Sequence, residues 1–130
     1  MNVVEVAAAI IRDASGRYLL ARRPAGSHLA GLWEFPGGKR HADETLEQCL
    51  RRELAEELGA SFDVGERVHS VEWTYDDTTI ALSFFRCEHT AGAIEAREAP
   101  ALAWVAPDRL GDYEFPPADR VLIERLQAEL

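Results

Sequence analysis

Three glutamates stand close together in the segment RRELAEELGA, residues 51–60. Glu53, Glu56 and Glu57 have the spacing i, i+3 and i+4, so on a helix they lie within an arc of about 100°. Like charges at this spacing repel one another. One interpretation is a solvated acidic face, on which Arg52 pairs with Glu56. The other is a site for hard divalent cations, because Mg²⁺ takes carboxylate oxygens and is often held against phosphates.

The residues before the glutamates favour the metal site. The chain reads GKRHADETLEQCLRRELAEELGA from Gly38, with Glu44 after five intervening residues and Arg52 after seven more. This pattern resembles the Nudix box, the loop–helix–loop signature of hydrolases that cleave nucleoside diphosphates linked to another moiety. Every charged and glycine position of the box is filled. The single departure is Ala60, where a larger aliphatic residue is usual, and a pattern with so many fixed positions is a specific signal.

The resemblance implies structural roles for four residues of this segment. Glu44 and Arg52 match a buried salt bridge that holds the loop against the helix. Gly37 and Gly38 would let the backbone approach a metal ion and phosphates, which a Cβ would obstruct.

The resemblance also implies the metal site. The implied metal ligands are the carbonyl of Gly38 and the carboxylates of Glu53, Glu56, Glu57 and Glu98, and the same four glutamates are the implied catalytic residues. Glu53 is the expected general base, with Glu98 as the alternative. Without the resemblance, Glu98 would be interpreted as an ordinary loop acid in EAREAP. The expected ion is Mg²⁺, for which Mn²⁺ can substitute.

The similarity extends along the whole chain to the MutT branch of the family, the pyrophosphohydrolases of oxidised guanine nucleotides. Shared segments include EFPGGK at 34–39 and FPPA at 115–118. By this match, a substrate pocket is lined by Arg23, His28, Phe35, Gly37, Gly38, Lys39 and Asp119. Trp33 and Phe35 could stack on a base or pack in the core. Lys39 could bind phosphates or be a solvated counter-charge. Residues 75–77 are interpreted mainly as a hairpin turn, with contact to the base as the minor alternative.

Asp119 is the most informative departure from that branch, which has an asparagine at this position. Ionised aspartate only accepts hydrogen bonds, which suits the exocyclic amine of cytosine, whereas a protonated carboxyl could donate to an oxidised purine. The segments GLWEFPGGK and PAD also resemble the CTP-type pyrophosphohydrolases. A structural alternative competes, because Asp119 stands where a helix N-cap is expected before RVLIERL.

The sequence therefore predicts a Mg²⁺-dependent nucleoside triphosphate pyrophosphohydrolase. The expected reaction converts 8-oxo-dGTP to the monophosphate and pyrophosphate, which implies a role in clearing damaged nucleotides before a polymerase uses them. The alternative substrates are CTP and 5-methyl-dCTP. A non-catalytic nucleotide-binding module is a third hypothesis, and the intact set of carboxylates argues against it.

Composition sets limits on the other classes of protein. The 130 residues carry a formal net charge of −9, with 23 acidic and 14 basic residues, which argues against binding to a nucleic acid polymer. The opening run MNVVEVAAAIIRD is interrupted by Glu5 and is interpreted as a strand, not as a signal peptide or a membrane span.

Cys49 and Cys87 have neither metal nor disulfide spacing and are expected to be buried thiols in a reducing compartment. We expect a cytoplasmic monomer whose partner is a small nucleotide.

The pattern of apolar residues predicts one domain, residues 1–130, of the α+β class, in which helices pack on a mixed β-sheet as an α/β/α sandwich. A helix is expected from about Thr45 to Leu58, with a capping box formed by Thr45 and Gln48 and a left-handed Gly59 at its end. A second helix over 120–130 would bury Leu122, Leu126 and Leu130. The expected strands are 3–11 and 18–23 as one hairpin, 67–75 and 79–88 as a second hairpin, and 101–105. Residues 24–39 are expected to be a loop.

Overall fold

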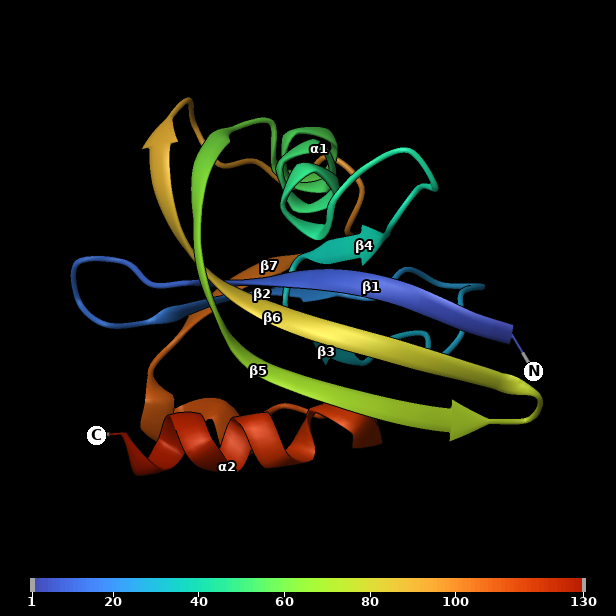
Figure 1. The fold of residues 1–130 in the computed structure, drawn as a ribbon. Helices are drawn as coiled ribbons and strands as arrows, with labels where there is room; N and C mark the ends of the chain where they lie inside the picture. The colour runs from blue at the N-terminus through green and yellow to red at the C-terminus, as the bar shows by residue number, and fades with distance from the viewer. Residues whose placement is uncertain (1, 130) are drawn as a thin grey trace.

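A computed structural model describes residues 2–129 of the chain. Two helices cover opposite sides of a layer of β-strands, α1 (Leu46–Leu58) above and α2 (Arg120–Ala128) below in Figure 1. The arrangement is the α+β sandwich that the sequence predicts. Neither helix within residues 2–129 has the length and apolar character that a membrane crossing needs.

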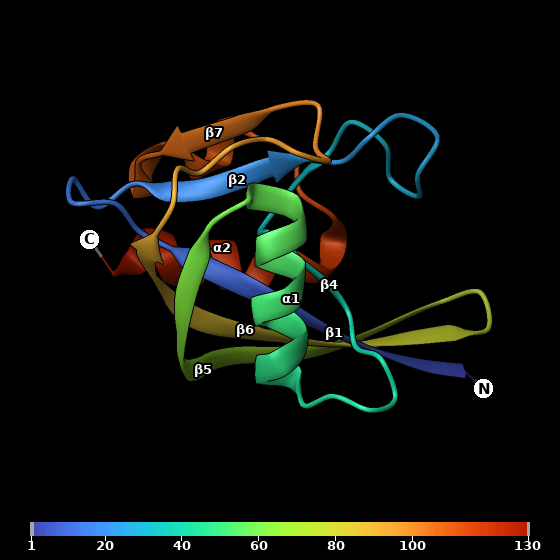
Figure 2. The same ribbon diagram turned by 90° about the horizontal axis from the view of Figure 1, so that it is seen from above.

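The larger sheet has four strands in the order β4-β1-β6-β5. Its strands are β1 (Asn2–Ile11), β4 (Gly37–Lys39), β5 (Ser61–Tyr75) and β6 (Thr78–Ala91). β1 runs parallel to β6, whereas β4 is antiparallel to β1 and β5 is antiparallel to β6. The β5–β6 hairpin is longer than predicted, and its turn at Asp76 and Asp77 projects well beyond α1 in Figure 2.

The smaller sheet has three strands in the order β3-β2-β7, all antiparallel. They are β2 (Tyr18–Arg22), β3 (Trp33–Glu34) and β7 (Leu102–Val105). The predicted hairpin between β1 and β2 is wrong, although the turn itself forms around Asp13, which accepts hydrogen bonds from the N–H groups of Ser15 and Arg17. The two strands share only an isolated bridge between Arg12 and Tyr18. Both edges of β1 are occupied by β4 and β6, so β2 joins the other sheet.

Local sequence explains where α1 begins and ends. Thr45 and Gln48 form the predicted capping box, with Thr45 Oγ1 accepting from the Gln48 N–H and the Gln48 side chain accepting from the Thr45 N–H. Gly59 ends the helix at φ = 66°, a conformation that costs glycine little. The buried face of α1 is Cys49, Leu50, Leu54 and Leu58. Cys49 and Cys87 are both buried free thiols, as predicted.

The core consists of two clusters on the two sides of the larger sheet. β1 alternates between them, with Ala7 and Ala9 facing α1 while Ala8 and Ile10 face α2. α2 contributes Leu122, Ile123 and Leu126 to the second cluster. The predicted third contact of this helix, Leu130, lies outside the described residues.

Residues 24–39 are more ordered than the sequence predicts, because they contain the short strands β3 and β4. Each is only two or three residues long and shows no alternation of apolar and polar side chains. They form because β2 and β1 offer free edges to them. β4 in turn brings Gly37 and Gly38 next to α1, where the glutamates lie.

Candidate active site

Arg52 is the centre of the contact between α1 and the loop before it. Its Nη2 donates to Glu44 Oε1 at 2.7 Å and its Nε donates to Glu44 Oε2 at 3.1 Å. Nη2 also donates to the carbonyl of Lys39, and the N–H of His41 donates to Glu44 Oε1. These hydrogen bonds lower the pKa of Glu44 to about 2. The predicted salt bridge is confirmed, and it ties the end of β4 to the helix.

Replacing Arg52 is expected to lower both stability and activity. In Arg52→Ala, Glu44 keeps its carboxylate in a site where its side chain is only 12% exposed, without the guanidinium that accompanies it. We expect a melting temperature several degrees below wild type at neutral pH, measured by circular dichroism. Arg51→Ala, at the exposed neighbouring position, is the matched control and should melt as wild type does. Equal melting of the two variants would contradict a stabilising role of the salt bridge.

The same guanidinium holds two of the glutamates. Arg52 Nη1 lies 2.9 Å from Glu53 Oε1 and 3.3 Å from Glu56 Oε2. The pairing of Arg52 with Glu56 that a solvated acidic face requires is therefore present. It does not account for the whole cluster, because Glu53 is mostly buried, with 17% of its side chain exposed, whereas the Glu56 side chain is 51% exposed.

Glu57 is the residue that a solvated face does not explain. Its Oε2 is buried and has no hydrogen-bond partner among the described residues. Burial, and after it the nearby carboxylates of Glu53, Glu34 and Glu98, together raise its pKa to about 9. A buried carboxylate oxygen without a partner among other acids fits a site that a cation completes.

The carboxylates do not form a ready-made metal cage. Within residues 2–129, no three His, Cys, Asp or Glu side chains are arranged so that they could hold an ion by themselves. This fits Mg²⁺, which usually keeps several waters and is held by one or two carboxylates together with substrate phosphates. Glu53 and Glu57 could hold such an ion, and Glu98 is near enough to act on the pKa of Glu57.

Two glycines bring the backbone close to this acidic cluster. A Cβ on Gly38 would overlap the carboxylate of Glu53, and a Cβ on Gly37 would overlap the carbonyl of Ala7 in β1. Both positions therefore require glycine, for the space that it leaves. The Gly38 backbone lies directly against Glu53, which is the arrangement that a shared metal ligand set needs.

Two adjoining cavities lie beside the glycines, and they share Arg23, Lys39, Ile80, Leu82 and Asp119. The inner cavity, of about 220 Å³, is also lined by Glu34, Phe35, Gly37 and Gly38. The outer cavity, of about 400 Å³, is also lined by His28, Leu29, Trp73, Tyr75 and residues 116–118. All seven residues predicted to contact substrate line one or both of these cavities. The structure brings them together from segments far apart in the chain.

Asp119 is buried at the junction of the two cavities, with 4% of its surface exposed. Asp119 stands at the N-cap position of α2, as the structural alternative expects, but it has helical backbone angles and its side chain makes no capping hydrogen bond. The 3₁₀ turn Pro117–Asp119 instead runs directly into α2. The pKa of Asp119 is raised to about 7, first by burial and then by the charge of Glu34, while the charge of Arg23 opposes the rise. Arg23 is itself paired with Glu34 at 2.7 Å.

The sequence of this site and its fold identify the family. A family model described as the NUDIX domain matches residues 7–125. The chain belongs to the Nudix family. The Nudix box interpretation and the predicted fold are thereby confirmed, and the protein is a Nudix hydrolase of the MutT type.

Curated relatives of this Nudix protein carry two different names. The CTP pyrophosphohydrolase of Escherichia coli (strain K12) is 44% identical over 128 residues, which cover 98% of this chain and 94% of the relative. The 8-oxo-dGTP diphosphatase of Haemophilus influenzae is 38% identical over 128 residues, with the same two coverages. The relatives therefore agree on the family and differ in the nucleotide that they are named for.

Solved structures of Nudix relatives have the same fold. The solution structure of the E. coli ORF135 protein has a TM-score of 0.84 at 43% identity and covers 98% of this chain and 91% of its own. The crystal structure of MutT protein from Methanosarcina mazei Go1 has a TM-score of 0.86 at 29% identity, with coverages of 98% and 95%.

Several cavity residues of this Nudix protein were not predicted from the sequence. These are Trp73, Ile80 and Leu82, which line the outer cavity. Tyr75, for which contact with the base was the minor alternative, also lines it and stacks on His28 with ring centroids 4.6 Å apart. They lie at alternate positions of β5 and β6, a spacing that could have marked them as one face of a hairpin. Trp33 is absent from both cavities and packs edge-on against Tyr113, so its core interpretation is the one that holds.

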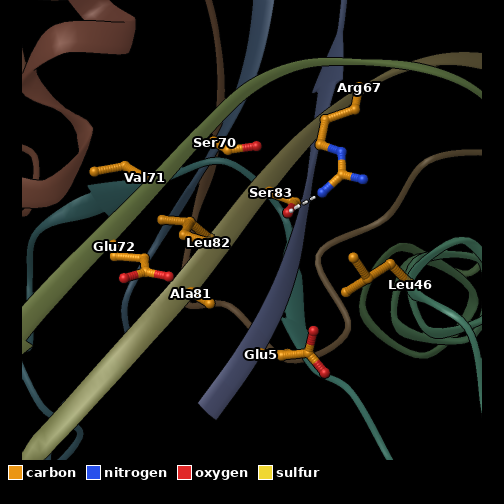
Figure 3. A pocket seen from close by; sticks show the side chains of 9 residues that line it. All are labelled: Glu5, Leu46, Arg67, Ser70, Val71, Glu72, Ala81, Leu82 and Ser83. Carbon is orange, nitrogen blue, oxygen red and sulfur yellow. Dashed lines mark hydrogen bonds between the residues drawn. The ribbon is translucent and has the colours of Figure 1, made fainter. Parts of the chain in front are cut away.

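A third cavity, of about 270 Å³, lies away from this site and is shown in Figure 3. Its polar side chains include Glu5, Arg67 and Ser83, which share with Phe85 the side of the sheet that faces α1. Glu5 is paired with Arg40, and Arg67 donates to Ser83 Oγ at 3.2 Å. Because Glu5 and Arg67 already have partners within the chain, we assign no ligand to this cavity.

Proposed function

We propose that this Nudix protein is a Mg²⁺-dependent nucleoside triphosphate pyrophosphohydrolase, in which Mn²⁺ can replace Mg²⁺. The observation that carries the proposal is the buried carboxylate oxygen of Glu57, which has no partner among the described residues and whose carboxyl is influenced by those of Glu53 and Glu34. Glu53 lies against Gly38, and Glu34 lines the inner cavity. The bound ion would neutralise the triphosphate charge and make a water molecule easier to deprotonate. The ligands would be the Gly38 carbonyl, Glu53, Glu56, Glu57 and Glu98.

The residues around the two cavities then have separate tasks. Lys39, at the end of β4, would bind the triphosphate where the inner cavity meets the outer one. Arg23 would support that wall through its pair with Glu34. Glu53 would accept the proton of the attacking water, with Glu98 as the alternative base. Attack at the β-phosphorus breaks its bond to the oxygen that links it to the α-phosphorus, and this releases a nucleoside monophosphate and pyrophosphate.

Asp119 decides the base in this proposal. Ionised, it only accepts and would take a hydrogen bond from the amine of cytosine. Cytosine nucleotides, including 5-methyl-dCTP, are our first candidate, which the 44% identity to a CTP pyrophosphohydrolase supports. The second candidate is 8-oxo-dGTP. It is supported by the raised pKa of Asp119, since a protonated carboxyl can donate, and by the relatives named 8-oxo-dGTP diphosphatase.

A product assay tests the proposal. Purified protein and Mg²⁺ are given dCTP, 5-methyl-dCTP, dGTP or 8-oxo-dGTP at low concentration, and phosphate and pyrophosphate are counted separately. Release of pyrophosphate with a preference for cytosine nucleotides is the expected result. A preference for 8-oxo-dGTP would select the second candidate and a role in clearing oxidised nucleotides. The absence of Mg²⁺-dependent hydrolysis of all four nucleotides would contradict the proposal and favour a non-catalytic nucleotide-binding module.

The pH dependence of base preference is expected to follow Asp119. The quantity to follow is the ratio of kcat/KM for dCTP to kcat/KM for 8-oxo-dGTP. Ionisations that affect both reactions equally cancel in this ratio. Since the folded pKa of Asp119 is raised to about 7, the ratio should rise with pH through that value as the carboxyl ionises. Asp119→Asn should remove this dependence and shift the ratio towards 8-oxo-dGTP by about tenfold.

Asp112→Asn is the matched control, because Asp112 is an exposed carboxylate outside the two cavities. It should keep the wild-type ratio at every pH. A wild-type ratio that does not change with pH, together with an unchanged ratio in Asp119→Asn, would remove Asp119 from base recognition.

A further inference from the structure

The C-terminal end of α1 is completed by a segment that lies far from it in the sequence. No basic residue stands in the last turn of the helix, although a cation there would interact favourably with the helix dipole. The loop after β6 supplies one. A Cβ on Gly59 would overlap the guanidinium of Arg97, so this side chain lies directly against the residue that ends the helix.

Two backbone hydrogen bonds fix the same loop to the helix. The N–H of Glu95 donates to the carbonyl of Leu58 at 2.9 Å, and the N–H of Arg97 donates to the carbonyl of Glu57 at 2.9 Å. Carbonyls at a helix end lack partners within the helix, so these bonds satisfy groups that would otherwise need water. Ile94 packs against the core cluster beneath α1, which holds the start of the loop in place.

This docking links two of the acidic residues through the backbone. Glu98 directly follows Arg97, and the carbonyl that accepts from Arg97 belongs to Glu57. Glu98 lies close enough to raise the pKa of the Glu57 carboxyl. The position of Glu98 relative to the α1 glutamates therefore depends on the contact between Arg97 and the end of the helix.

We propose that Arg97 is a positioning residue, which holds Glu98 near Glu57 by docking its loop onto the C-terminal end of α1. The carboxylate pair that Arg97 makes within residues 2–129 is a loose one, since its Nε lies 3.6 Å from Glu95 Oε2 and both side chains are more than half exposed. Its function is thus the contact with the helix end. The inference rests on the proposed function in one respect, which is that Glu98 takes part in the metal site. The docking of the loop does not depend on it.

The test compares Arg97→Ala and Arg97→Lys with wild type, and uses Arg109→Ala as the matched control. Arg109 is likewise an exposed arginine beside an acid, Asp112, and it lies outside the site. Three quantities are measured: amide hydrogen exchange of Glu95 and Arg97 in the metal-free protein, Mn²⁺ affinity by electron paramagnetic resonance, and kcat and KM for the nucleotide.

In Arg97→Ala we expect the backbone amides of residues 95 and 97 to exchange faster than in wild type. We also expect about tenfold weaker Mn²⁺ binding and a lower kcat with little change in KM. Arg97→Lys keeps a cation at the helix end and should recover part of each loss. Unchanged exchange and unchanged Mn²⁺ affinity in Arg97→Ala would overturn the inference. So would a rise in KM alone, which would make Arg97 a phosphate ligand. If wild type binds no Mn²⁺ and hydrolyses nothing, the proposed function fails, while the exchange rates still decide whether Arg97 docks the loop.

Discussion

Glu53→Gln is expected to fold normally and to lose nearly all hydrolysis. The amide keeps an oxygen that can accept from Arg52 Nη1, so the contact that orders this side chain survives. It cannot take a proton from water, and it removes one negative charge from the place where the metal is expected. We expect kcat to fall by about 10²–10⁴-fold, the range that follows removal of a general base, with the melting temperature unchanged.

The controls for this variant separate the two candidate bases. Glu98→Gln should also reduce turnover, but by less than Glu53→Gln if Glu53 is the base. Glu47→Gln, at an exposed position on the first turn of the same helix, should hydrolyse nucleotide as wild type does. Near-normal turnover in Glu53→Gln with a large loss in Glu98→Gln would transfer the role of base to Glu98.

Local sequence was sufficient to predict the part of the site that lies on α1. The capping box of Thr45 and Gln48 and the left-handed Gly59 fix where the helix begins and ends, and so fix which face carries the glutamates. The long β5–β6 hairpin was predicted from its two apolar runs and the turn at Asp76. Each of these features depends on residues close together in the chain.

Features that depend on distant pairing were missed or misassigned. β3 and β4 are too short to show a pattern, and they exist because β2 and β1 present free edges. Asp119 has the sequence position of an N-cap, but the preceding 3₁₀ turn continues into α2 and turns the carboxyl into the cavities. No local signal reveals which way such a side chain points.

The same distinction applies to the two sides of the proposed site. Apart from Glu98, the phosphate side is built from one continuous segment, from Gly37 to Glu57, and a sequence motif can record it. The base side is assembled from β5, β6, the loop with His28 and the turn before α2. Its chemistry depends on how these segments meet, which is why the fold and the family could be predicted while the base remains a proposal.

Glu57→Gln is expected to abolish hydrolysis and, at the same time, to stabilise the metal-free protein at alkaline pH. The folded pKa of Glu57 is raised to about 9 from an ordinary value of 4.5, chiefly by burial and then by neighbouring carboxylates. For a carboxyl whose pKa is raised on folding, stability is fully present below the unfolded pKa and is lost as pH rises towards the folded pKa. The metal-free wild type should therefore become less stable between about pH 5 and about pH 9, whereas glutamine carries no charge at any pH.

The measurement is the free energy of unfolding in urea with a chelator, at several pH values, for wild type, Glu57→Gln and the exposed control Glu124→Gln. Over this pH range we expect the free energy of unfolding of Glu57→Gln to rise by about 3 kcal/mol relative to that of wild type. A tenfold change in an acid dissociation constant corresponds to about 1.4 kcal/mol, and relaxation of the site absorbs part of the full effect. Asp119 titrates in all three proteins, so its contribution cancels in the comparison.

Adding Mg²⁺ should stabilise wild type and the control but not Glu57→Gln, since an ion that binds only the folded state stabilises it. Equal stabilisation of all three proteins by Mg²⁺ would mean that Glu57 is not a ligand, and its buried carboxylate would then need another partner.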